Sequence, residues 1–426
     1  MHLWGMLLSI LKLLFSYCPF KPMCLQAMKN VKESEALHLM AQVLLLMLMG
    51  SSVAIAAELT VPIHYLGKVR DRPPVLSNLV AWPEDDGEPG AKLGIVDNNT
   101  TGKFLKQEYQ LSLNRIGKDG DAVAAAKTLL ADGSRFVVLN VSADDLKQIA
   151  ALPEAADDLL FNAGSTDKTL RNEFCTPNVL HTLPSRGMYA DALMQFFNKR
   201  KWRDVFLISG NRPGDIKYAE ALRASAKKFG LKIRHDKTWL TDSDIRRNAS
   251  SEVPVFTQER NYDVVLVTDE DQDFSNYLLY HTWLPRPVAG SAGLRAVAWD
   301  PVVEQWGAAQ LQSRFSKVTD RAMTGVDYAV WAAVRSVGEA VTRTQSADVS
   351  AVRTYMLSEE FSLAGFKGAK LSYRSWNAQL RQPIPLVHAN AVVAQAPLEG
   401  FLHRVTELDT LGVDGPESKC EAFADQ

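Results

Sequence analysis

The sequence lacks the short motifs that most often mark catalysis or cofactor binding. It contains four cysteines in 426 residues. None of them forms the C-x-x-C-H motif of haem attachment, and no His/Cys cluster has zinc-site spacing. The G-x-S-x-G elbow, the P-loop and the G-x-G-x-x-G fingerprint are also missing. We therefore expect a protein that is not an enzyme, with no cofactor and no metal site.

The chain also lacks an excess of charge of either sign. Lys and Arg total 47, Asp and Glu total 49, and the formal net charge is −2. No basic stripe is present, so the composition does not indicate a nucleic-acid partner. No low-complexity or repeated segment interrupts the sequence. The length beyond residue 57 is sufficient for two domains of ordinary size.

Long apolar runs are confined to the first 57 residues. The run from Leu39 to Met49 follows Lys29 and Lys32 and precedes Ala54-Ile-Ala, the small-x-small pattern of a cleavage site. We predict that residues 1–57 are a signal peptide with an over-extended start, and that the remaining chain is periplasmic without stable membrane insertion. The alternative is an uncleaved anchor, because residues 39–57 approach the ~20 apolar residues that a membrane span needs.

Two cysteines would remain after cleavage. Cys18 and Cys24 lie in the leader, whereas Cys175 and Cys420 lie in the predicted mature chain. In an oxidising compartment one pair of cysteines permits one connectivity. We predict a Cys175–Cys420 disulfide that ties the C-terminal tail, residues 401–426, to the rest of the chain. The alternative is two unrelated thiols.

Strand and helix patterns alternate along the predicted mature chain. Largely apolar runs such as 136–141, 205–208 and 262–268 are typical of buried parallel strands, and helical periodicity follows them. This alternation predicts an α/β fold with two doubly wound parallel-sheet lobes joined by a hinge that the chain crosses several times. We assign residues 58–182 and 297–345 to the first lobe, and 183–296 and 346–400 to the second.

Two polar turns follow predicted strands, where open α/β sheets place their ligands. The first turn contains Ser165 and Thr166, whose hydroxyl and backbone N–H groups could bind a ligand or simply cap a helix. The second is acidic and contains Asp269 and Glu270, which could receive a cation or the hydroxyls of a polyol. It lacks the glycine and spacing of an EF-hand, so a solvated acidic turn is the alternative.

Several segments resemble one family. Met323-Thr-Gly-Val-Asp-Tyr-Ala, together with the turn at Asn162-Ala-Gly-Ser-Thr, resembles the type I periplasmic binding proteins of the branched-chain amino-acid branch. The segments Thr282-Trp-Leu-Pro-Arg-Pro-Val and Leu408-Asp-Thr-Leu-Gly-Val-Asp resemble a subfamily of ABC-transporter substrate-binding proteins. That subfamily is associated with pyrroloquinoline-quinone (PQQ)-dependent alcohol dehydrogenases. The resemblance runs from about Leu59 onward.

The resemblance implies a small-molecule ligand held in the cleft between two lobes by hinge closure. The family's first-lobe contacts fall on four residues, namely Ser142, Ala163, Ser165 and Thr166. Its acidic contact corresponds to Asp300. The second lobe departs from the family, because Asn211-Arg-Pro-Gly and Thr268-Asp-Glu-Asp stand where amino-acid binders carry aromatic residues. Amino-acid binding is therefore not implied.

The implied partners are an ABC permease or components of the PQQ alcohol dehydrogenase system. Two alternatives stay open at this point. One is an accessory protein of the dehydrogenase that has no role in transport, which a ligand-free cleft would favour. The other is a periplasmic enzyme, which a convergent group of ionisable residues with perturbed pKa values in the cleft would favour.

Overall fold

The computed structural model describes residues 58–72, 81–133, 135–240 and 245–423. The predicted signal peptide lies outside the described residues. Contacts divide the chain into residues 1–57 and 58–426, and the described residues all belong to the second unit. No helix among the described residues has the length and apolar character needed to cross a membrane.

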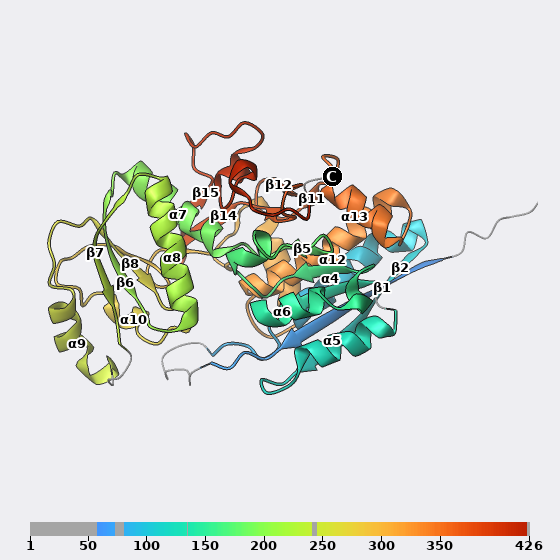
Figure 1. Ribbon diagram of the computed structural model, residues 1–426, viewed down its shortest axis with the longest axis horizontal. Helices are drawn as coiled ribbons and strands as arrows, with labels where there is room; N and C mark the ends of the chain where they lie inside the picture. Colours follow the sequence, from blue (N-terminus) through green and yellow to red (C-terminus); the bar gives the residue numbers. More distant parts are fainter. Residues whose placement is uncertain (1–57, 73–80, 134, 241–244, 424–426) are drawn as a thin grey trace, which may run out of the picture. The chain divides into compact units, whose positions relative to one another are not determined.

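Parallel strands and helices alternate through most of the unit (Figure 1). The strands are β1 (Leu59–Lys68), β2 (Gln107–Ile116), β3 (Phe136–Asn140), β4 (Leu159–Asn162), β5 (Val179–His181), β6 (Asp204–Ser209), β7 (Lys232–Thr238), β8 (Val264–Thr268), β9 (Val288–Gly290), β10 (Arg295–Ala296), β11 (Leu363–Ala364), β12 (Lys370–Tyr373), β13 (Leu380–Arg381), β14 (Ile384–His388) and β15 (Ala391–Ala396). The α-helices are α4 (Glu88–Leu105), α5 (Ala122–Ala131), α6 (Ala143–Ala150), α7 (Arg186–Arg200), α8 (Pro213–Lys228), α9 (Ile245–Phe256), α10 (Ser275–Leu278), α11 (Ala308–Phe315), α12 (Gly325–Thr344) and α13 (Val349–Leu357).

The first lobe contains a five-stranded sheet in the order β2-β1-β3-β4-β5, with every pairing parallel. Successive side chains of a strand point to opposite faces. Phe136 and Val138 of β3 therefore pack with α12, whereas Val137 and Leu139 pack with α5 and α6. Strand β2 lies on one side of β1, and β3, the next strand along the chain, lies on the other side. The crevice between β1 and β3 is thus the topological switch point of this sheet.

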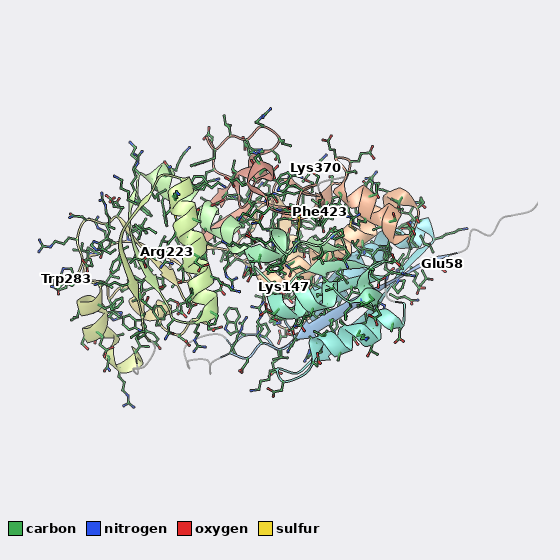
Figure 2. The ribbon with its side chains drawn as sticks, viewed as in Figure 1. Glu58, Lys147, Arg223, Trp283, Lys370 and Phe423 are labelled. Carbon is green, nitrogen blue, oxygen red and sulfur yellow. A yellow bond between two sulfur atoms is a disulfide. The ribbon has the colours of Figure 1, made fainter. Side chains whose placement is uncertain are left out.

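The second lobe contains a four-stranded parallel sheet in the order β7-β6-β8-β9. Val205 and Leu207 of β6 pack with α7 and α8, and Phe206 and Ile208 pack with α9 and α10. The switch point of this sheet lies between β6 and β8. Both lobes are doubly wound, as the alternating sequence pattern predicts, and side chains fill the space between each sheet and its helices (Figure 2).

The chain passes between the two lobe cores at three hinge crossings, residues 182–185, 296–299 and 381–384, and the C-terminal tail returns from the second core at Leu411 to the first core at Cys420. These passages are hydrogen-bonded to one another. Gln382 Nε2 donates to the carbonyl of Thr182 at 2.8 Å, and Val297 N–H donates to the carbonyl of Pro385 at 3.1 Å. The predicted multi-crossing hinge is therefore present.

Two details differ from the sequence-based expectations. The apolar pattern from Val303 to Phe315 predicts one helix, but α11 begins only at Ala308, because Trp306 and Gly307 have left-handed φ angles of 57° and 83° that interrupt a right-handed helix. The segment from α13 to β13, which we had assigned to the second lobe, packs into the first core through residues such as Val352 and Leu371. Within residues 346–400, β14 and β15 are the strands that pack with the second core.

Candidate functional site

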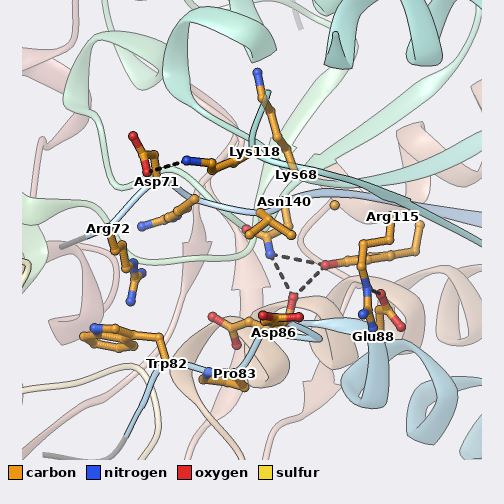
Figure 3. A pocket seen from close by; sticks show the side chains of 15 residues that line it. Lys68, Asp71, Arg72, Trp82, Pro83, Asp86, Glu88, Arg115, Lys118 and Asn140 are labelled. Carbon is orange, nitrogen blue, oxygen red and sulfur yellow. Dashed lines mark hydrogen bonds and ion pairs between the residues drawn. The ribbon is translucent and has the colours of Figure 1, made fainter. Parts of the chain in front are cut away.

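A pocket of about 310 Å³ lies at the switch point of the first lobe (Figure 3). It is formed by the carboxyl ends of β1, β2 and β3 and by the turn that precedes α4. The lining includes five cationic residues, Lys68, Arg70, Arg72, Arg115 and Lys118, and four acidic residues, Asp71, Glu84, Asp86 and Glu88. The pocket therefore stands where doubly wound sheets bind their ligands, and charged side chains dominate it.

A hydrogen-bond network fixes the floor of this pocket. Tyr65 Oη donates to the carbonyl of Asp86 at 2.7 Å, and Asn140 Nδ2 donates to the same carbonyl at 2.9 Å. A Cβ on Gly67 would lie 2.4 Å from Tyr65 Oη, so glycine allows the ring to lie against the strand end. The turn at Asp86–Gly87 is thus held against β1 and β3.

The cations of the pocket have partners of unequal strength. Arg115 pairs with Glu88 at 2.5 Å, whereas Lys68 and Lys118 lie 3.6 Å from Asp145 and Asp71. The Lys118–Asp71 pair is also exposed, and such pairs contribute little stability.

Two arginines in the segment after β1, Arg70 and Arg72, contact groups other than carboxylates. Arg70 donates to the carbonyl of Gly164 in the turn after β4. The guanidinium carbon of Arg72 lies 3.8 Å from the ring centroid of Trp82. Within the described part of the chain, neither arginine forms an ion pair, and the buried Nη1 of Arg72 has no hydrogen-bond partner.

Burial and the neighbouring carboxylate of Asp327 raise the pKa of Asp86 to about 6, although Thr324 Oγ1 donates to Asp86 Oδ1 at 2.5 Å. A raised carboxyl pKa means that the folded state favours the protonated form. The stability that Asp86 contributes is therefore complete below its unfolded pKa and is lost as pH rises through about 6.

Asp86→Asn should remove this dependence, because asparagine stays neutral. As pH rises from 4.5 to 8, the unfolding free energy of the variant should increase by about 2 kcal/mol relative to that of the natural chain. Urea unfolding at both pH values measures the difference. If the two proteins differ in unfolding free energy by the same amount at both pH values, the raised pKa of Asp86 is contradicted.

A second pocket of about 150 Å³ lies in the second lobe, beside the ends of β8 and β9. Arg186, at the start of α7, binds both carboxylate oxygens of Glu270 at 2.7 and 2.6 Å. Tyr189 and Tyr218 line the same pocket, and burial raises the pKa of both phenols. This pocket combines one neutralised ion pair with two aromatic rings.

Among the predicted second-lobe residues, Asp269 and Glu270 line this pocket. The carboxylate of Asp269 accepts hydrogen bonds from the backbone N–H groups of Asp273, Phe274 and Ser275, at 2.8–2.9 Å. Its oxygens therefore order the turn before α10. Asp300 lines neither pocket. It pairs with Arg295 at 3.1 Å and accepts the N–H of Val302.

The predicted first-lobe residues lie at strand ends outside both pocket linings. Ser142 caps α6 by accepting the N–H of Asp145 at 3.0 Å. Ala163 is fully buried, and the backbone of Ser165 is held by Asn162 and Arg171. Thr166 accepts the N–H of Arg186 through its carbonyl at 3.0 Å. The turn after β4 reaches the first pocket through Gly164 and Arg70.

The sequence reasoning did not select Arg70, Arg72, Trp82 or Arg115. A signal was present for the first two, since Gly67-Lys-Val-Arg-Asp-Arg directly follows the first strand. The contributions of Trp82 and Arg115 depend on how the ends of separate strands meet. The predicted cysteines do form a disulfide, Cys175–Cys420, with an S–S distance of 2.06 Å.

No group of three or more His, Cys, Asp or Glu side chains is placed to hold a metal ion in the part of the chain that the structure describes. The acidic turn at 269–273 is instead neutralised by arginines. Arg186 binds Glu270, and Arg212 binds Asp271 and Asp273.

Comparison with known proteins identifies the fold. Residues 85–278 match a family model described as periplasmic binding protein. A periplasmic binding protein from Burkholderia mallei has a TM-score of 0.63 at 14% identity, covering 85% of this chain and 99% of that one. A leucine-, isoleucine-, valine-, threonine- and alanine-binding protein from Brucella ovis has a TM-score of 0.62 at 14% identity, covering 77% and 89%.

A solute-binding protein of an ABC transporter from R. palustris, in complex with benzoate, has a TM-score of 0.60 at 12% identity, covering 85% and 99%. No curated protein sequence matches the chain. The chain has the two-lobed α/β fold of the type I periplasmic binding proteins. The relatives named here are described as binding proteins.

Proposed function

We propose that this chain is the periplasmic substrate-binding protein of an ABC-type uptake system and that it holds one small molecule between its lobes. The observation that carries this proposal is the arrangement of the pockets. Each doubly wound lobe has a pocket beside the carboxyl ends of its strands, and three crossings join the lobes. Such a hinge permits closure around a ligand.

The contacts between the lobes suit a closing motion. Lys217 of α8 pairs with Asp167, in the turn after β4, at 2.6 Å. Burial alone would raise the pKa of Asp167, but the Lys217 ammonium and the N–H of Thr169 hold that pKa below its ordinary value. Glu270 and Asp271 of the second lobe also act electrostatically on Arg72 of the first pocket. A ligand that bridges these groups would favour the state in which they lie close together.

Within this proposal the predicted contact residues keep their roles as hypotheses. Ser165 and Thr166, in the turn after β4, would contact the ligand. Ser142 and Ala163 would contact it from neighbouring strand ends. Glu270, paired with Arg186, would contact the ligand from the second lobe, and Asp269 would position Glu270. Asp300 would act from beside the second crossing, at 296–299, where Arg295 already binds it.

The biological setting is proposed from sequence resemblance. Segments such as Thr282-Trp-Leu-Pro-Arg-Pro-Val resemble proteins associated with PQQ-dependent alcohol oxidation. We infer that the ligand is an alcohol, its acid product or a factor that such a system requires. The partners would be a permease or components of the alcohol dehydrogenase system, and the signal peptide would be cleaved on export.

A thermal-shift screen tests the proposal. The panel comprises short alcohols, aldehydes, carboxylates, amino acids, PQQ, and calcium and lanthanide ions. A ligand at one hundred times its Kd should add about 2.7 kcal/mol of stability, which is a readable increase in Tm. The increase should follow a one-site saturation curve, whereas a non-specific stabiliser such as sucrose should not saturate. If no compound in the panel raises Tm, the binding-protein proposal is contradicted.

A further inference from the structure

The first-lobe pocket contains a cationic group that lacks a counterpart. Arg72 follows β1 and is partly buried, and its Nη1 atom has no hydrogen-bond partner among the described residues. A buried guanidinium N–H without an acceptor is costly, so such groups are normally satisfied by protein, water or ligand. Arg72 also lines the first-lobe pocket, so this cation stands beside a space where a small molecule would fit.

We propose that this pocket binds the carboxylate of a small, singly charged organic acid, with Arg72 as its principal contact and Trp82 beside the body of the ligand. This inference rests on the proposed binding function and adds the chemical class of the ligand. The cavity of about 310 Å³ is within the range of small-molecule sites.

The geometry of Arg72 suits a carboxylate better than a neutral group. Its guanidinium lies over the ring of Trp82, 3.8 Å from the ring centroid (Figure 3). Stacking uses a face of the guanidinium and does not consume the N–H groups along its edge. That edge presents two parallel donors that match the two oxygens of a carboxylate.

The charge balance of the lining favours a monoanion. Five cations and four acids line the pocket, which gives a formal charge of +1. The Arg115–Glu88 pair is close, whereas the Lys68 and Lys118 pairs are long and Arg70 donates to a backbone carbonyl. Positive charge is therefore concentrated on the segment Lys68–Arg72. The remaining acids, such as Glu84 and Asp71, would oppose a doubly charged phosphate ester.

The cationic state of Arg72 is maintained at neutral pH. Burial and the neighbouring Arg70 lower the pKa of Arg72 to about 10, while Asp86, Asp271 and Glu270 act in the opposite direction. A pKa of about 10 leaves the guanidinium protonated under physiological conditions. Two of the opposing carboxylates belong to the second lobe, so its acidic turn lies close enough to act on the same arginine.

The test compares acids and alcohols of the same carbon skeleton. The probes are acetate with ethanol, butyrate with 1-butanol, and benzoate with benzyl alcohol, titrated into the natural protein in thermal-shift and calorimetric assays. The proposal predicts that at least one acid binds and that its alcohol binds at least about tenfold more weakly, because a hydrogen bond to a charged group is worth about 1.5–3 kcal/mol.

The matched variants are Arg72→Gln and Arg223→Gln. Arg223 lies on α8, pairs with Asp236 and lines neither pocket (Figure 2). Arg72→Gln should weaken acid binding by about 10- to 100-fold, and Arg223→Gln should leave it unchanged. Arg72→Lys keeps the charge but not the paired donors and should give an intermediate affinity. The Tm of each ligand-free variant reports whether it is folded.

The outcomes separate this inference from the proposed function. Acids that bind Arg72→Gln as tightly as the natural protein would overturn the inference, as would alcohols or amino acids that bind when none of the acids does. In those cases the chain would still be a small-molecule binding protein. If neither these probes nor the wider panel produces a saturable shift, both the inference and the proposed function fail.

Discussion

Replacing Asp409 by alanine is expected to lower the free energy of unfolding by about 3–5 kcal/mol. The carboxylate of Asp409 is completely buried and binds two arginines. Arg374 Nε lies 2.9 Å from Oδ1, and Arg381 Nε lies 2.8 Å from the same oxygen. The side chain of Arg374 is itself only 1% exposed. Removing the carboxylate leaves a buried cation without its counter-charge, which is the costly way to break a buried ion pair.

The effect should extend to the hinge. Arg381 belongs to β13 and is the first residue of the crossing at 381–384, and Arg374 Nη2 also donates to the carbonyls of Leu408 and Leu411. The network therefore fastens the C-terminal segment against one of the three crossings. Chemical denaturation measures the stability loss, and hydrogen exchange of residues 380–388 should report local loosening.

Glu407→Ala is the matched control, because Glu407 lies on the same short helix as Asp409 but is exposed. It should change stability by less than about 0.5 kcal/mol. Asp409→Asn should fall between the two variants, since the amide oxygen still accepts hydrogen bonds but carries no charge. A loss below about 1 kcal/mol for Asp409→Ala would contradict the importance assigned to the network.

Removing the disulfide should have the second-largest effect. Cys175 and Cys420 are joined across 245 residues, so the bond greatly restricts the unfolded chain. Loss of such a bond typically costs about 2–4 kcal/mol. Cys420→Ser should therefore lower Tm by several degrees, and the reduced natural protein should melt at the temperature of the variant.

The single and double cysteine variants provide an internal control. Cys175→Ser, Cys420→Ser and the double variant should be equally destabilised, because each lacks the same bond. A double variant that loses twice as much would show that the two thiols contribute separately by packing. An unchanged Tm in Cys420→Ser would show that the bond does not stabilise the fold.

Much of the fold could be predicted because the central strands carry a local signal. The runs Phe136–Asn140 and Val264–Thr268 are apolar on both faces, as parallel strands covered by helices must be. Asp121 directly before the helical pattern of Ala122–Ala131 predicts an N-cap, and Asp121 does cap that helix. In contrast, nothing local revealed that α13 packs on α12 in the first core, because the lobe to which a helix belongs is decided by long-range packing.

The residues that line the pockets were harder to predict from the sequence for a similar reason. The turns after β4 and β8 were located correctly at strand ends, but their side chains proved to be engaged in caps and ion pairs, as for Asp269 and Glu270. The cationic pocket combines residues from three strand ends and the turn before α4. Whether Arg72 has a partner depends on that assembly, which no local pattern encodes.

The most direct test of the central claim is X-ray scattering combined with calorimetric titration of the purified protein, using compounds from the screening panel. The account predicts saturable binding of at least one compound at one site per chain, with a smaller radius of gyration when that site is filled. Binding without a change in the radius of gyration would contradict closure of the lobes. The absence of saturable binding by any compound would contradict the account as a whole.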